Sequence, residues 1–329
     1  MLRRLDQKLA RIRAGAYTRA DFIIADAKDP DMGPGLTGAG PARHADGTWS
    51  RYRTRAEFLD NILQVVEQDI VDIMLVSASN LERLHQSRVF EGSAVKAAIR
   101  ANDASDIWVG RGAAYKTQPS RPFRTASLRH CKALTDLGLY SMTFNNNLER
   151  DMASLEAFAQ FRADAEAQEF GYFLEVFNPN VATGIAPELA PAYVNDCILR
   201  CLAGLTQAER PQFLKIAFNG PAALEELASF DTTLIVGVLG GAAGTTRDCF
   251  ELIRQAEKYG ARVALFGRRI NLAESPLDMI RFMRAVADDA MQPAAAVAAY
   301  HDALRKAGIA PARDLAADSA ITEATLKHG

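Results

Sequence analysis

The chain has 329 residues, of which 49% are hydrophobic and 24% are charged, and its formal net charge at pH 7 is −2. This composition is ordinary for a globular protein that buries a large core. The near balance of acidic and basic residues gives no electrostatic basis for binding nucleic acid or an anionic membrane surface, so we expect neither partner.

The start of the chain, MLRRLDQKLARIR, is amphipathic but lacks the continuous apolar stretch of a signal peptide. No apolar run approaches the roughly 18 residues that a membrane-spanning helix requires. The cysteines at positions 131, 197, 201 and 249 include no Cys-x-x-Cys pair. We therefore expect a cytoplasmic protein with reduced cysteines.

In chain order, an amphipathic helical pattern at residues 2–14 is followed by eight short apolar runs with the composition of β-strands. The predicted strands are Asp21–Asp26, Ile70–Ser77, Val95–Ala101, Leu137–Phe144, Tyr172–Phe177, Gln212–Phe218, Thr233–Leu239 and Arg262–Phe266. Helical patterns separate most of these strands. The clearest are Thr54–Asp69, Leu148–Gln168, Glu188–Leu205, Pro221–Phe230, Thr245–Tyr259 and Pro276–Asp288.

This alternation predicts an α/β protein with a parallel sheet covered by helices on its outer face. Eight such units match a (β/α)8 TIM barrel. A doubly wound open sheet is the alternative, and it is weakened because no Gly-x-Gly-x-x-Gly sequence follows an early strand.

We predict one barrel domain over residues 1–329, with an extra N-terminal helix within 1–18 and a C-terminal helical extension over 289–329. The extension begins with a helical pattern at Pro293–Ala307. These additions would cap the barrel or pack on a neighbouring subunit, and we expect a homo-oligomer.

Two segments that follow predicted strands, Lys28–Arg53 and Asn102–Arg124, are long for loops within a compact domain. Loops of this length are usually functional or disordered. On a barrel they lie at the C-terminal face, where active sites are built. The first contains His44, Trp49 and Tyr52, so we expect it to be a lid or a loop that contacts substrate.

Lys215 lies within the apolar run Phe213–Phe218, where an ammonium group is costly to bury unless it is paired. A lysine amine in its neutral form is a nucleophile toward carbonyls and can form a Schiff base. The structural alternative is a lysine at the end of a strand whose amine reaches solvent.

Strand side chains alternate between faces, so three polar positions are candidates for the barrel mouth beside Lys215. Glu175 shares a strand face with Phe173 and Phe177, while Asp26 and Lys28 share a face with Ile24. A carboxylate near an amine can act as general acid or base during Schiff-base formation. The structural alternative is a buried ion pair between Glu175 and Lys215, which would stabilise the fold only weakly.

The last two predicted strands end in sequences suited to an anion. Gly240 and Gly241 follow the seventh strand and precede a helix, and Gly267 and Arg268 follow the eighth strand. Glycines let backbone N–H groups approach an anion, a helix N-terminus adds a favourable dipole, and an arginine can clamp phosphate. Phosphate sites recur at this position in TIM barrels.

The positions of Lys215, Gly240–Gly241 and Gly267–Arg268 resemble those in the Schiff-base, class I aldolases of the archaeal-type fructose-bisphosphate aldolase and tagatose-bisphosphate aldolase branch. Asp26 and Glu175 match positions where these enzymes place carboxylates, and the resemblance is strongest over residues 170–285. It implies a TIM barrel, an aldol reaction without metal or other cofactor, and a phosphorylated ketose or related sugar as substrate.

Two features depart from the pattern of that family. Both long loops are additional, and the fourth strand lacks an interior lysine or tyrosine near its end, because Tyr140 is in mid-strand. A metal-dependent aldolase is disfavoured, because the five histidines are scattered without a partner at ligand spacing.

We therefore expect a lyase in which Lys215 is the nucleophile, Glu175 transfers protons and Asp26 holds or deprotonates a substrate hydroxyl. Gly240, Gly241, Gly267, Arg268 and Lys28 are expected to bind substrate or its phosphate. A transaldolase or isomerase using the same site, and a non-catalytic sugar-phosphate-binding barrel, remain as alternatives.

Overall fold

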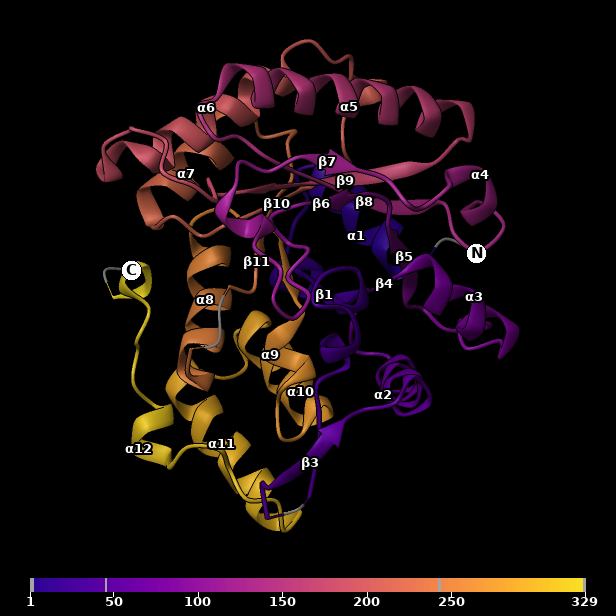
Figure 1. Cartoon of the computed structure of the whole chain (residues 1–329). Coiled ribbons are helices and arrows are strands. Elements are labelled where there is room, and N and C mark those ends of the chain that lie inside the picture. The colour runs from indigo at the N-terminus through magenta and orange to yellow at the C-terminus, as the bar shows by residue number, and fades with distance from the viewer. Residues whose placement is uncertain (1–2, 45, 242–243, 328–329) are drawn as a thin grey trace.

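A computed structural model describes residues 3–44, 46–241 and 244–327, and in it eight parallel strands close into a barrel (Figure 1). Around the barrel the strands follow one another in chain order, and the last pairs with the first. They are β1 (Ile23–Lys28), β4 (Ile73–Val76), β5 (Lys96–Arg100), β8 (Leu137–Thr143), β9 (Gly171–Phe177), β10 (Leu214–Ile216), β11 (Val236–Leu239) and β12 (Val263–Phe266). Each predicted strand overlaps one of these, which confirms the TIM-barrel prediction.

Helices cover the outside of the barrel, and the long α5 and α6 lie on the opposite side from α10 and α11 (Figure 1). The helices are α1 (Arg4–Arg13), α2 (Arg55–Gln68), α3 (Ala78–Gln86), α4 (Leu128–Cys131), α5 (Leu148–Ala167), α6 (Ala190–Leu202), α7 (Pro221–Phe230), α8 (Thr246–Lys258), α9 (Arg268–Asn271), α10 (Pro276–Ala287), α11 (Pro293–Lys306) and α12 (Leu315–Asp318). Within the described ranges, no helix is long and apolar enough to cross a membrane.

The two long loops each contain a short antiparallel strand pair. The first contains β2 (Pro41–Arg43) and β3 (Trp49–Tyr52), and the second contains β6 (Asp103–Ala104) and β7 (Pro122–Phe123). Both follow barrel strands and therefore lie at the C-terminal end of the barrel, as predicted. Position 45 of the first loop, the start of the predicted helix at residues 2–14, and positions 328–329 of the predicted extension lie outside the described residues.

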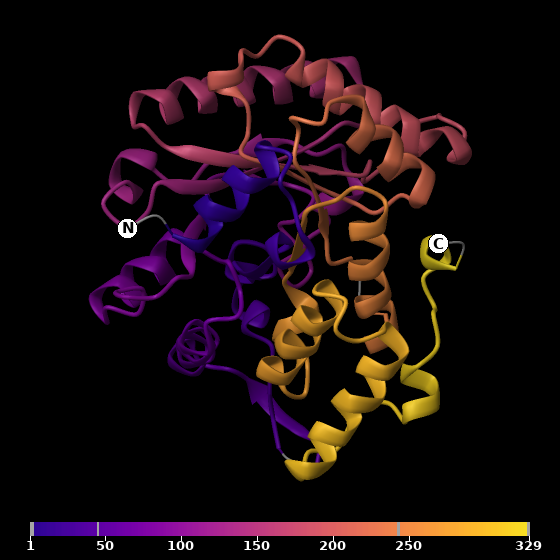
Figure 2. The same ribbon diagram turned by 180° about the vertical axis from the view of Figure 1, so that it is seen from behind.

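The barrel interior is filled by one apolar cluster, and α1 closes its N-terminal end. Leu5, Leu9 and Ile12 of α1 join interior residues such as Phe173 and Phe213, whose rings stack with centroids 4.6 Å apart. From behind, α1 lies across the barrel (Figure 2). Of the two roles expected of the N-terminal helix, the structure shows that it caps the barrel, and the polar C-terminal end is the open one.

A buried carboxylate fastens α1 to the barrel. Asp72, which immediately precedes β4, has no exposed surface and accepts hydrogen bonds from Arg4 (2.8 Å), Lys8 (3.0 Å) and the backbone N–H of Ile24 (2.9 Å). Burial lowers the pKa of Lys8, and the negative charge of Asp72 opposes that shift. Each charge is therefore tolerated because the other is present.

Replacing Asp72 with alanine should leave the Lys8 ammonium buried without its carboxylate and reduce the free energy of unfolding by about 3–5 kcal/mol. Urea unfolding followed by circular dichroism measures this loss. Asp302→Ala is the matched control, because Asp302 is half exposed in a surface pair with Arg305 and its loss should cost less than about 1 kcal/mol. Equal losses in the two variants would contradict this account of how α1 is held.

Candidate active site

A layer of polar side chains lies directly above the apolar barrel interior on four adjacent strands. Arg100 of β5, Ser141 of β8, Glu175 of β9 and Lys215 of β10 each follow an interior apolar residue by two positions. Because strand side chains alternate, the polar residues face the same interior space, one layer nearer the mouth. Sequence order and sheet order thus combine to gather four polar groups on one half of the barrel.

These side chains form one connected network. The Lys215 amine lies 2.6 Å from Glu175 Oε1, as the register of β9 and β10 dictates. The other oxygen, Oε2, accepts from the Ser141 hydroxyl at 2.6 Å and from Arg100 at 3.4 Å. Arg100 also donates to Ser141 and to Asp29, the residue after β1. Burial alone would lower the pKa of Arg100, but the carboxylates of Asp29 and Glu175 raise it above its ordinary value.

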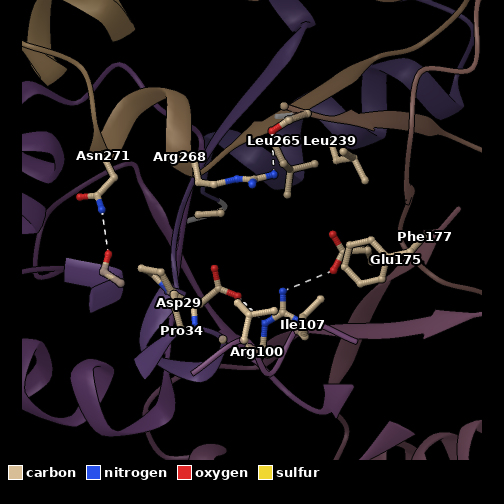
Figure 3. A pocket seen from close by; sticks show the side chains of 18 of the residues that line it. Asp29, Pro34, Arg100, Ile107, Glu175, Phe177, Leu239, Leu265, Arg268 and Asn271 are labelled. Carbon is tan, nitrogen blue, oxygen red and sulfur yellow. Dashed lines mark hydrogen bonds and ion pairs between the residues drawn. The ribbon is translucent and has the colours of Figure 1, made fainter. Parts of the chain in front are cut away.

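A cavity of about 530 Å³ opens above this network at the C-terminal end of the barrel. Its lining includes the network residues Lys215, Glu175, Arg100 and Asp29, and also Arg268. Figure 3 shows the side chains of Glu175, Arg100, Asp29 and Arg268 converging on one hollow. Residues between 30 and 38 of the first long loop, and Asp106, Ile107 and Val109 of the second, complete the walls. The part of the first loop that lines the cavity is therefore its beginning, whereas His44 lines a separate surface pocket.

Asp26 and Lys28 do not reach the mouth, so their predicted position is wrong. On β1, Ala25 and Ala27 point into the barrel interior, whereas Ile24 points into the layer between the strands and the helices. Because strand side chains alternate, Asp26 and Lys28 lie on the same outer face as Ile24. They form a fully buried ion pair of 3.1 Å on the outer face of β1. Burial raises the pKa of Asp26 to about 6 and lowers the pKa of Lys28.

Converting this pair to apolar residues, as Asp26→Leu/Lys28→Met, should leave any reaction at the cavity intact and stabilise the fold or leave it unchanged. Lys28→Met alone leaves a buried carboxylate unpaired and should cost about 3–5 kcal/mol. Because the folded pKa of Asp26 exceeds its ordinary 3.8, the contribution of this carboxyl is fully present below that pH and is lost as pH rises through about 6.

Urea unfolding of the wild type and the double variant at several pH values between about 4 and about 7 measures this difference. The wild type should lose up to about 3 kcal/mol relative to the double variant over that range. If the double variant folds but loses activity, Asp26 or Lys28 takes part in the reaction, and their exclusion from the active site is wrong.

Four of the five residues expected to bind substrate or its phosphate line the cavity, and Lys28 is the exception: the four are Gly240, Gly241, Gly267 and Arg268. Arg268, in the first turn of α9, donates to the Gly241 carbonyl at 3.0 Å and so ties the two loops together. Gly240 also has a packing role, because a Cβ there would lie 2.4 Å from the ring of Phe266. Gly241 has φ of +61°, a conformation that favours glycine.

The α8 N-terminus, which was expected to contribute its dipole to anion binding, is occupied by the chain's own C-terminal segment. The Thr246 N–H donates to Asp318 at 2.8 Å, and the Thr245 N–H donates to Asp248 at 2.9 Å. These N–H groups are therefore engaged within the protein. Ala242 and Ala243, between the glycines and α8, lie outside the described residues.

The same C-terminal segment reaches the glycine loop itself. Asp248, in the first turn of α8, accepts from the Thr322 N–H (2.8 Å), the Thr322 hydroxyl (2.5 Å) and the Glu323 N–H (3.2 Å). Glu323 pairs with Arg269 at 3.0 Å and lies close to Gly241. Burial raises the pKa of Glu323. The predicted extension therefore braces the two loops that carry the expected anion site.

Asp248→Ala should detach this segment, because it removes the acceptor of three hydrogen bonds from residues 322 and 323. We expect a loss of about 3 kcal/mol in the free energy of unfolding, since hydrogen bonds to a charged and buried acceptor are lost. Trypsin should also release the peptide that begins at Asp314 faster than in the wild type. Asp196→Ala, at an exposed position of α6, is the control, and unchanged cleavage in Asp248→Ala would contradict the proposed brace.

Sequence reasoning missed three of the site's residues, namely Asp29, Arg100 and Ser141. Arg100 offered a signal, because it follows the apolar residues Ala97–Ile99 and lies two positions after Ala98 at the end of the strand. Tyr140 faces outward, where its ring lies 4.4 Å from that of Phe161, so the expected lack of an interior tyrosine at this point holds. Within the described ranges, no group of three or more His, Cys, Asp or Glu side chains is placed to hold a metal ion.

No protein-family model matches the sequence, and no curated protein matches it. The fold is similar to that of an archaeal fructose 1,6-bisphosphate aldolase, with a TM-score of 0.63, 16% identity, and coverage of 87% of this chain and 99% of the other. A Schiff-base-forming fructose-1,6-bisphosphate aldolase gives a TM-score of 0.64 at 16% identity, covering 86% and 99%. A protein of Corynebacterium glutamicum gives 0.58 at 15% identity, covering 87% and 98%. At such identities the likeness establishes the barrel fold.

Proposed function

We propose that the chain is a Schiff-base-forming aldolase that makes or cleaves a carbon–carbon bond in a phosphorylated ketose or a related compound. The observation that carries this proposal is the Lys215 amine, 2.6 Å from the Glu175 carboxylate and lining an open cavity. A purely structural ion pair has no need of a cavity beside it. The structural likeness to Schiff-base aldolases supports the same reaction class.

The reaction would begin with attack of the Lys215 amine on the substrate ketone, which forms a carbinolamine. Glu175 can take the proton that the amine sheds and return it to the hydroxyl that leaves as water, giving an iminium ion. Removal of a proton from the hydroxyl on the carbon β to the iminium carbon then breaks the bond between the α and β carbons, and the electron pair of that bond enters the iminium to form an enamine. An aldehyde is released, and protonation and hydrolysis of the enamine free the lysine.

Asp29, rather than Asp26, is placed to hold or deprotonate that substrate hydroxyl. It lines the cavity and follows β1, and its link to Arg100 fixes its position. Arg100 also contacts Glu175, so one guanidinium orients both carboxylates. The proposed roles therefore need no interior lysine or tyrosine on β8, where Ser141 instead donates to Glu175.

Arg268 and the adjoining glycines would hold the phosphate. The Arg268 guanidinium faces the cavity across from Asp29 and Arg100 (Figure 3), and it forms no ion pair among the residues described. A guanidinium free of carboxylates, next to glycine backbone, is suited to clamping an anion.

Lys215→Arg tests the nucleophile, because it keeps the positive charge but a guanidinium does not deprotonate in proteins. The variant should remain folded, lose carbon–carbon cleavage by about 10⁴-fold or more, and lose covalent trapping by borohydride in the presence of a ketose phosphate. Mass spectrometry of the trapped wild-type protein should place the adduct on the peptide containing Lys215.

Lys96→Arg is the matched control, because Lys96 pairs with Asp136 away from the cavity and its replacement should leave trapping unchanged. An adduct on the Lys28 peptide, or no adduct on any lysine, would refute the assignment. The absence of an adduct, combined with tight binding of the ketose phosphate, would favour a non-catalytic binding protein.

A further inference from the structure

The charges and the lining of the cavity narrow the class of substrate. We propose that the substrate carries a single anionic group, held at Arg268, and a largely apolar remainder directed at the opposite wall, rather than the second phosphate and full set of hydroxyls of a sugar bisphosphate. This inference rests on the proposed function, because it takes Lys215 as the group that meets the carbonyl.

The cavity has three cationic side chains among its described lining residues, and two of them are already matched by carboxylates. Lys215 pairs with Glu175, and Arg100 pairs with both Asp29 and Glu175. Arg268 alone contacts no carboxylate within ion-pair distance in the described part of the chain, and it donates to a backbone carbonyl. One cation is therefore free to neutralise a ligand anion, and a second anion would have to displace Asp29 or Glu175.

The wall facing Arg268 offers a second phosphate no unpaired cation. In Figure 3, Asp29, Arg100 and Ile107 lie across the hollow from Arg268, and Arg100 is already paired with Asp29 and Glu175. Asp106, next to Ile107 in the chain, adds another lining carboxylate. Lys28, which was expected to serve as a phosphate ligand, is directed to the outer face of β1 as the partner of Asp26. Placing like charges together at a binding surface is strongly unfavourable.

Much of the remaining surface is apolar, and the polar groups on it are already hydrogen-bonded. Pro34, Ile107, Val109, Phe177, Leu239 and Leu265 line the cavity. The Asn271 amide donates to the Gly38 carbonyl at 3.0 Å, and Asp106 accepts from the hydroxyls of Ser120 and Thr143. A substrate hydroxyl set against such a surface would lose its water without gaining a partner.

The arrangement of the strands accounts for this apolar side. β11, β12, β1 and β4 are adjacent in the barrel and carry Leu239, Leu265, Ala27 and Leu75 on the inner face, beside the polar half built by β5, β8, β9 and β10. The carbonyl chemistry thus lies on the polar half, and a ligand extending from it meets apolar side chains.

Three ligands separate the two parts of this proposal: fructose 1,6-bisphosphate, fructose 1-phosphate and 5,6-dideoxyfructose 1-phosphate. Dissociation constants are measured by calorimetry on Lys215→Arg, which cannot cleave them, and borohydride trapping is measured on the native protein. Fructose 1-phosphate should bind about 10-fold or more tightly than the bisphosphate, and the dideoxy compound about 10-fold more tightly again. Arg268→Ala should weaken binding of both monophosphates.

Two substitutions of Val109, a partly exposed cavity-lining residue that follows Ile107 by two positions, make the charge test direct. Relative to Val109→Gln, Val109→Lys should shift the affinity ratio of bisphosphate to monophosphate about 10-fold toward the bisphosphate, because it supplies the missing cation. An unchanged ratio would overturn the claim that charge excludes the second phosphate.

The remaining outcomes distinguish this inference from the proposed function. Tightest binding and trapping of the bisphosphate would overturn the inference while leaving Schiff-base chemistry in place. If the affinities follow the expected order but no adduct is trapped, Lys215 is not a nucleophile, while the claim that the cavity accepts a single anion stands. Failure of all three ligands to bind would overturn the inference itself.

Discussion

The polar half of the barrel depends on one constraint: charges buried at the mouth must neutralise one another. Four charged groups, Asp29, Arg100, Glu175 and Lys215, are nearly excluded from water and form a continuous chain of contacts. Removing Glu175 would leave Lys215 without its carboxylate, and removing Arg100 would leave Asp29 without its cation, each in a poorly hydrated space. The network therefore fixes the position of the Lys215 amine, and it also determines which cation is left for a ligand.

Much of the fold follows from local patterns that the sequence displays directly. Eight apolar runs separated by helical periodicity identify the strands, and the helices that connect them favour the parallel order of a barrel. Lys215 and Glu175 could be placed together because each shares a strand face with large apolar residues, and the observed register aligns them. The phase of β1 was harder to predict, because all six of its residues are buried and neither face is marked by exposure.

On β1 the small interior residues Ala25 and Ala27 alternate with the larger, charged Asp26 and Lys28. A polar residue in a barrel strand is readily predicted to lie in the mouth. Here Asp26 and Lys28 instead face the surrounding helices, where each neutralises the charge of the other. Asp29 takes the place in the mouth because it follows the strand's last residue. Its contact with Arg100 joins residues 71 positions apart, which no periodicity within a strand could reveal.

The glycine loop shows how packing and proposed binding coincide. A side chain at position 240 would collide with the ring of Phe266, so a glycine is required there. The C-terminal segment is held by Asp248 of α8, which contacts Thr322, and by Arg269 of α9, which contacts Glu323. That segment covers the helix N-terminus on which a phosphate could otherwise rest. Under the proposed function an anion would be left with Arg268 and the nearby glycine backbone, so the extension that braces the loop would also limit the cavity to one position for an anion. This restriction follows from covalently attached residues, and it is therefore present before any ligand arrives.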